Sequence, residues 1–129
     1  MRIIFNFFSL CFAFLFLILN NSTYAYAIGN VDWLLLKENK DGKEWLDISS
    51  IKPIKEKEIS VLTKFYKKPT TSKDKAQLFL YVMRINCIDK SYKDTSINGI
   101  PQFKSKWQVS NNDELIDVVI EKSCSEITK

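Results

Sequence analysis

The sequence of 129 residues contains no histidine and only three each of glycine, proline and cysteine. Without histidine, the commonest general base, the commonest zinc ligand and every Ser-His or Cys-His nucleophile pair are excluded. There is no glycine-rich phosphate loop, no C-x-x-C redox motif and no D-x-D-x-D-G calcium loop. We therefore expect a non-enzymatic protein without cofactor or metal. One catalytic alternative stays open, a carboxylate acid–base pair among Asp32, Asp47, Asp89 and Asp94.

Residues 1–27 differ in composition from the rest of the chain. They hold six of the nine phenylalanines, one basic residue and no acid. A basic start, an apolar run at residues 7–19 and Ala-Tyr-Ala at residues 25–27 are typical of a secretory signal peptide. We predict cleavage after Ala27, and hence export to the periplasm, the cell surface or the medium. Two alternatives are retention of the leader as a membrane anchor and lipid attachment at Cys11, which the bulky residue before it disfavours.

Residues 28–129 are predicted to form a single small domain. Their 18 basic and 15 acidic residues give a formal charge of +3, which is too balanced to indicate a nucleic-acid partner. We expect no membrane span once the leader is removed. A domain of about 100 residues has a thin core and commonly needs a covalent or metal crosslink.

Two cysteines, Cys87 and Cys124, remain after the leader. In an oxidising compartment such a pair is expected to form a disulfide. Alternation of apolar side chains places Cys87 on the core side of a strand at residues 76–87. A period of 3.6 places Cys124 on the apolar face of a helix at residues 112–124. We predict a disulfide between sheet and helix; two buried free thiols are the alternative.

The secondary structure expected for this domain is mainly strand. Alternating or apolar segments predict strands at residues 31–37, 44–48, 58–66, 76–87 (the longest) and 91–97, and a last short one around Trp107 and Val109. In the segment 58–66, Ile59, Val61, Thr63 and Phe65 are expected to face the core.

Turn and cap residues mark the connections between these segments. Asp41-Gly42 predicts a type I′ hairpin, residues 49–53 a turn or a short irregular piece, and residues 98–101 a second turn. Ser110 or Asn112 is the expected N-cap of the helix.

Lysines gather around the longest polar stretch of the domain, residues 67–75. We expect an exposed, mobile loop there, which is either simply solvated or a contact for an acidic protein or a glycan. The candidate binding residues of this loop are Lys64, Tyr66, Lys67, Lys68, Lys73 and Lys75. The three tryptophans are expected to pack on the sheet or in the core.

The order of several landmarks resembles the surface-adhesin protein E family of small exported bacterial proteins. The landmarks are Trp33, the segment W-L-D-I-S-S-I at residues 45–51, Cys87, Tyr92, Trp107 and a closing helix that carries Cys124. The resemblance covers about residues 31–124. It implies an α+β fold, a six-stranded antiparallel sheet whose concave face holds the C-terminal helix through a Cys87–Cys124 disulfide.

For function, the resemblance implies an adhesin, because members on the bacterial surface bind host matrix and serum proteins, and some dimerise. No binding residue can be carried over, since the matching residues are framework positions. Surface-displayed members are lipid-anchored, whereas this leader is typical of cleavage, and the usual proline-rich approach to the helix is replaced by residues 107–112. We expect an exported protein that binds a protein or glycan, with a homodimer as one expected state. The alternative is a periplasmic structural or inhibitory partner of an envelope protein.

Overall fold

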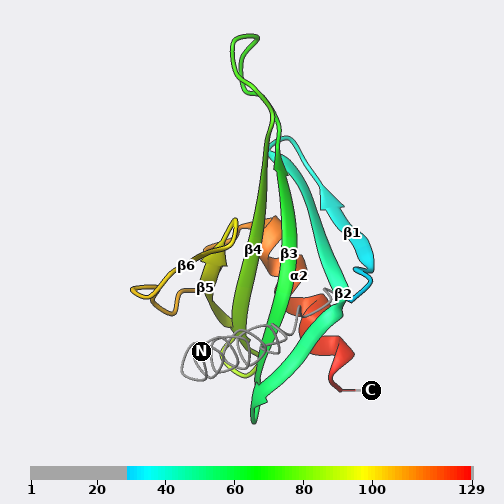
Figure 1. The fold of residues 1–129 in the computed structure, drawn as a ribbon, viewed down its shortest axis with the longest axis vertical. Coiled ribbons are helices and arrows are strands. Elements are labelled where there is room, and N and C mark those ends of the chain that lie inside the picture. Colours follow the sequence, from blue (N-terminus) through cyan, green and yellow to red (C-terminus); the bar gives the residue numbers. More distant parts are fainter. Residues whose placement is uncertain (1–28, 129) are drawn as a thin grey trace, which may run out of the picture.

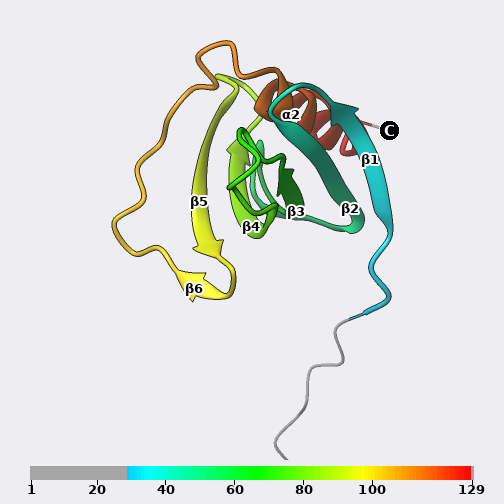
Figure 2. The same cartoon turned by 90° about the horizontal axis from the view of Figure 1, so that it is seen from above.

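A computed structural model describes residues 29–128, so the predicted signal peptide at residues 1–27, with Cys11, lies outside the described residues. Six strands form one antiparallel sheet in sequence order, and a helix follows them (Figure 1). The elements are β1 Trp33–Glu38, β2 Gly42–Lys55, β3 Glu58–Lys67, β4 Gln77–Asn86, β5 Ser91–Ile97, β6 Ile100–Pro101 and α2 Glu114–Glu126. The sheet curves around α2 (Figure 2), which confirms the expected α+β fold. Over residues 29–128, no helix combines the length and apolar character needed to cross a bilayer.

The core lies between the concave face of the sheet and α2. Alternate residues of the central strands point inward, and the helix contributes an apolar stripe. The buried cluster consists of Leu46, Ile59, Val61, Met83 and Ile85 from the sheet and Val119 and Ile120 from the helix. The expected inward set of β3 is confirmed, because Ile59, Val61 and Thr63 are buried and Phe65 is half-buried.

A disulfide joins Cys87, just after β4, to Cys124 of α2. The two Cα atoms are 5.7 Å apart, within the usual range for a bridge. Both half-cystines pack against the core cluster. The predicted disulfide is therefore confirmed, and it fastens the helix to the sheet.

Of the turn or short irregular piece expected at residues 49–53, the turn is wrong, because β2 continues through it, whereas the irregular piece is confirmed by a break in strand pairing. The pairing of β2 with β3 is interrupted there by a register shift that begins at Asp47. The Ser50 hydroxyl fills the gap: it donates to the Asp47 carbonyl (2.6 Å) and accepts from the Leu62 amide (2.7 Å). Pro53 is tolerated because ladder pairing is already irregular near it.

The side chain of Asp47 stabilises the same region. This aspartate is 3% exposed. One carboxylate oxygen accepts from the Asp32 amide (2.8 Å), the Ser49 amide (3.1 Å) and the Ser49 hydroxyl (2.6 Å). The Trp-x-Asp-x-Ser pattern at residues 45–49 thus has a structural role, because the hydrogen bonds of Asp47 hold the start of β1 against β2.

The hairpin between β1 and β2 forms, but the expected type I′ turn is wrong. That turn needs a positive φ at both central residues, and neither Asp41 nor Gly42 has one. Instead, the Asn39 carboxamide oxygen accepts from the amides of both residues (2.9 and 3.1 Å). Gly42 is required for space, because a Cβ there would lie 2.2 Å from the Tyr66 carbonyl oxygen and 2.5 Å from the Phe65 ring.

Three further features of the strands differ from expectation. The longest strand is β2, with 14 residues, rather than β4. The turn predicted at residues 98–101 includes a sixth strand, because Asn98 and Gly99 both adopt positive φ and Ile100–Pro101 pairs back onto β5. The short strand expected around Trp107 is wrong, since the only pairing there is an isolated bridge between Tyr92 and Gln108.

The N-cap of α2 is Asp113, so the expected caps are wrong. Its carboxylate accepts from the amides of Leu115 and Ile116, at 2.9 and 3.4 Å. Asn112 cannot cap because its φ of 67° belongs to the left-handed region, whereas a cap residue is extended. The hydroxyl of Ser110 is used elsewhere, since it donates to the Asp117 carboxylate.

Candidate functional site

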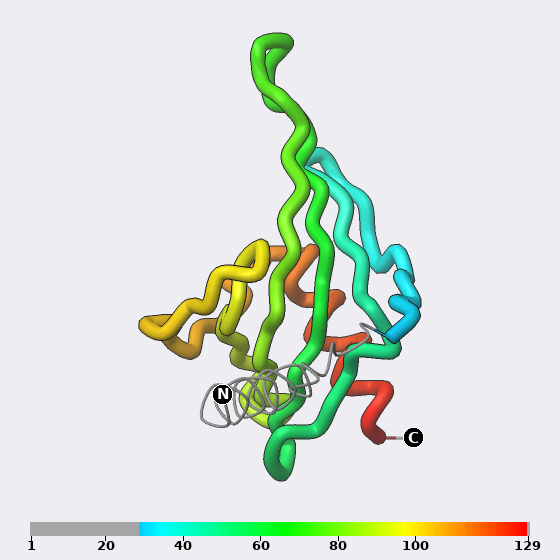
Figure 3. The backbone as a smooth tube through the Cα atoms, viewed as in Figure 1, coloured from blue at the N-terminus to red at the C-terminus, as the bar shows by residue number. Residues whose placement is uncertain are grey.

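The connection between β3 and β4 projects beyond the rest of the sheet (Figure 3). The two strands stay paired up to Lys67 and Gln77. The loop between them is closed by the Asp74 carboxylate, which accepts from the Thr70 hydroxyl (2.6 Å) and the Thr71 amide (2.9 Å). These hydrogen bonds lower the pKa of Asp74. The expected loop is therefore an ordered, solvent-facing hairpin end.

Four of the six candidate binding residues gather at this hairpin: Lys67, Lys68, Lys73 and Lys75. A shallow hollow of about 270 Å³ separates the strand ends and is lined by three of these lysines. Lys68 is already engaged, because its ammonium lies 2.7 Å from a Glu38 carboxylate oxygen and 2.8 Å from the Asn39 carbonyl oxygen. The other three lysines are exposed and form no ion pair with any residue of the 29–128 segment. We call Lys67, Lys73 and Lys75 the hairpin lysines.

The structure places Lys64 and Tyr66 apart from the hairpin lysines. Both lie on the convex face of the sheet, because they alternate with the inward residues of β3. The Lys64 ammonium lies 4.3 Å from the Trp33 ring centroid and 4.8 Å from that of Trp45. This cation–π contact holds the charge against the sheet. Half-burial of the two indoles on the sheet face agrees with the expected packing role. The expectation is wrong for Trp107, which is 41% exposed.

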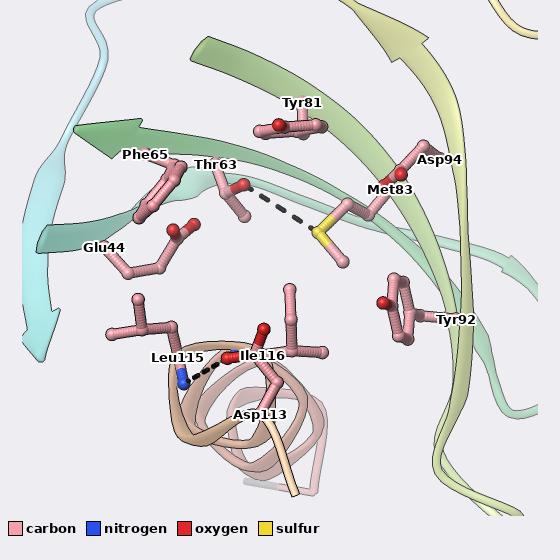
Figure 4. Close-up of a pocket in the computed structure, with 10 residues that line it drawn as sticks. All are labelled: Glu44, Thr63, Phe65, Tyr81, Met83, Tyr92, Asp94, Asp113, Leu115 and Ile116. Carbon is pink, nitrogen blue, oxygen red and sulfur yellow. Dashed lines mark hydrogen bonds between the residues drawn. The ribbon is translucent and has the colours of Figure 1, made fainter. Parts of the chain in front are cut away.

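A second candidate site is a cavity of about 220 Å³ between the N-terminal end of α2 and the concave face of the sheet (Figure 4). Three acidic and three aromatic residues line it: Glu44, Asp94, Asp113, Phe65, Tyr81 and Tyr92. They come from β2, β3, β4, β5 and the cap of α2. No lysine or arginine is among the lining residues. We call this space the acidic cavity.

Glu44 is the most buried acid of the cavity, with 3% of its surface exposed. Its carboxyl group points into the space (Figure 4). Burial, assisted by the negative charges of Asp113 and Asp94, raises its pKa to about 8, although a hydrogen bond with Thr63 acts in the opposite direction. Lys37 is its neighbour on β1, but the Lys37 ammonium pairs with Glu114 at 2.8 Å.

The pKa values of three other groups of the cavity, Asp94, Tyr81 and Tyr92, are perturbed in the same direction. Burial raises the pKa of Asp94, which is half-exposed. Burial, together with the charge of Asp94, also raises the pKa values of Tyr81 and Tyr92. Desolvation is the main cause of these shifts, and the neighbouring acids add to it for Glu44, Tyr81 and Tyr92, so that a cation entering the cavity would favour the ionised forms.

Of the four aspartates considered for acid–base chemistry, only Asp94 reaches this cavity. Asp47 is saturated by backbone and serine donors, and Asp89 accepts from the amide and hydroxyl of Ser91. Glu44 is not among the functional residues predicted from the sequence. The available signal was its alternation with Leu46, which shares the inward face of β2.

Comparison with protein families gives one result for this chain. A model described as the surface adhesin-E family matches residues 34–129. The match includes every strand except the first residue of β1, both half-cystines and all residues of the acidic cavity. Comparisons with curated proteins and with solved structures gave no significant match.

Proposed function

Because the chain belongs to the surface adhesin-E family, we propose that it is an exported, non-enzymatic binding protein that uses the hairpin lysines to engage a host matrix or serum protein, or a glycan. Family membership supports an adhesin-like role and favours binding over catalysis. The observation that carries the assignment to the hairpin is its projection from the sheet with three exposed ammonium groups, none of which forms an ion pair within residues 29–128.

The physical basis of this contact is electrostatic. Lysine ammonium groups on a projecting loop can reach carboxylates or sulfates on a large partner without rearrangement of the sheet. Exposed charges mainly accelerate encounter and contribute modest affinity, and salt screens them. Binding through the hairpin lysines is therefore expected to weaken as ionic strength rises.

Solid-phase binding to laminin, vitronectin and heparin over a salt series tests this proposal. The protein is purified from cells that express the whole reading frame. A variant with glutamine at the three hairpin lysines is compared with a variant of equal charge in which Lys55, Lys104 and Lys106, all exposed elsewhere, become glutamine. We expect saturable binding to at least one ligand, at least tenfold weaker in the hairpin variant and little changed in the control.

Two results would contradict the proposal separately. If none of the three ligands binds saturably, the adhesin assignment fails. If both triple variants lose binding equally, net charge is responsible and the hairpin is not the contact.

We also propose that the leader is cleaved after Ala27 and that the remaining chain is displayed on the cell surface. Mass spectrometry of the exported protein should give a mass that starts at residue 28, and surface-added protease should degrade the protein in intact cells. A soluble periplasmic pool protected from protease would favour a partner within the envelope instead. Sedimentation of the same material reports whether a homodimer forms.

A further inference from the structure

We propose that the acidic cavity binds an alkylammonium cation, supplied either by a small amine or by a lysine side chain of a partner protein. This inference rests on the cavity and is independent of the hairpin lysines. The cavity combines three acidic side chains and three aromatic rings around one space (Figure 4). Carboxylates and aromatic faces together are the groups that recognise organic cations.

In the described part of the chain, no lysine or arginine forms an ion pair with an acid of the cavity. Glu44 is 3% exposed, and buried carboxylates are normally paired with a cation or several donors. Within residues 29–128, its one donor is the Thr63 hydroxyl, whose oxygen also lies 3.8 Å from the Met83 sulfur, a second acceptor for the same proton. With a pKa of about 8, Glu44 is largely protonated at neutral pH in the empty cavity, and a bound cation would favour its ionised form. The carboxylate then offers about four acceptor positions, most of which are available to the ligand.

Asp94 and Asp113 differ in the hydrogen bonds that their carboxylates already accept. The Asp94 carboxylate forms no hydrogen bond or ion pair with any residue between 29 and 128. Asp113 uses one oxygen to cap α2 and lends its charge to the cavity. Glu44 and Asp94 are therefore the acceptors expected to contact the three N–H donors of an ammonium group.

The size and the remaining lining define the ligand further. A volume of about 220 Å³ is below the range of roughly 300–1,000 Å³ for drug-sized ligands, and suits a short alkyl chain. Met83, Leu115 and Ile116 supply an apolar wall for that chain. A metal ion fits less well, because no three acidic, cysteine or histidine side chains of the described segment are close enough to share one.

Amide-detected NMR titration with n-butylammonium, the equivalent of a lysine side chain, tests the proposal. The matched neutral probe is 1-butanol. We expect saturable shifts at the amides of Glu44, Asp94 and Tyr92, and an affinity at least tenfold higher for the cation than for the alcohol. Equal affinities would mean an apolar hollow without cation recognition and would overturn the proposal, as would the absence of saturable binding.

Variants separate recognition from general charge. Glu44→Gln keeps the shape of the side chain and should weaken n-butylammonium binding at least tenfold. Glu121→Gln makes the same change on an exposed turn of α2 and should leave affinity unchanged. Asp94→Asn is the second test, used if Glu44→Gln does not give a folded spectrum. Unchanged affinity in a folded Glu44→Gln or Asp94→Asn protein would refute the site.

A lysine-containing peptide and its norleucine counterpart distinguish the two sources of the cation. If the lysine peptide binds at least as tightly as n-butylammonium and the norleucine peptide does not, the cavity receives a lysine of a partner protein. If only the free amine binds, the cavity is a small-molecule site. Either result supports cation recognition, and neither depends on the matrix-binding assays of the hairpin variants.

Discussion

Replacing Glu44 with glutamine tests whether the buried carboxyl group of the acidic cavity lowers stability as it ionises. Burial raises the pKa of Glu44 from 4.5 to about 8. The folded protein thus holds this proton more tightly than the unfolded chain. The contribution to stability is complete below the unfolded pKa and is lost as the pH rises towards the folded pKa. Each pH unit in that interval lowers the free energy of unfolding by about 1.4 kcal/mol.

Between pH 5 and pH 9, ionisation of Glu44 is therefore expected to lower the free energy of unfolding by about 4 kcal/mol. This is a large part of the roughly 5–15 kcal/mol of a typical domain. Glutamine has the same shape and does not titrate, so Glu44→Gln should lose less stability than the wild type over this range. The difference between the two proteins should grow with pH by about the same 4 kcal/mol.

Urea unfolding at pH 5, 7 and 9, followed by tryptophan fluorescence with the disulfide intact, measures this difference. Neighbouring groups titrate in both proteins, so their contributions to the pH dependence of unfolding largely cancel in the difference. The pKa of Asp94 shifts in the same direction as that of Glu44, and Tyr81 and Tyr92 ionise above their ordinary pKa of 10. Glu121→Gln, on the exposed side of α2, is the control and should follow the wild type at every pH.

Parallel pH profiles for Glu44→Gln and the wild type would refute this reasoning. They would mean that Glu44 ionises in the folded protein as easily as in the unfolded chain, so that its carboxyl group is hydrated rather than desolvated. The unpaired, desolvated carboxyl group on which the cation site depends would then not exist.

Two further predictions concern the framework. Cys124→Ala should lower the free energy of unfolding by roughly 2–5 kcal/mol because it releases α2 from the sheet; an unchanged urea midpoint would contradict this. Gly42→Ala should cost about 1–3 kcal/mol, since its new methyl group would meet the Tyr66 carbonyl oxygen and the Phe65 ring. Gly29→Ala, which meets nothing within 4 Å, should change the thermal midpoint little, and equal effects of the two alanines would dismiss the steric explanation.

Several features of the fold followed from short-range patterns in the sequence. Alternation along residues 58–66 identified the inward side of β3, and a 3.6-residue period identified the buried stripe of α2. These two periods also directed Cys87 and Cys124 towards one core, where they form the disulfide. Such patterns are readable because the geometry of a strand or helix sets the direction of each side chain.

Other features depended on contacts between distant segments. The turn considered at residues 49–53 did not form. β2 continues there, and the Ser50 hydroxyl bridges β2 and β3. Lys64 looked like part of the polar loop, but its place on the convex face sets it against two indoles from β1 and β2. Sequence proximity to residues 67–75 did not determine which face of the sheet it occupies.

The sequence by itself determined the family, the strand and helix periods and the cysteine pair. Each of these is encoded in the order and spacing of residues, either within a short segment or along the whole chain. Only the tertiary structure decided which charges remain in water and which are buried. Glu44 and Asp94 lie 50 positions apart in the chain, and Asp113 comes later still, at the N-cap of α2. They share one cavity because the sheet curves and α2 closes over one part of its concave face, and burial depends on that closure rather than on any local pattern.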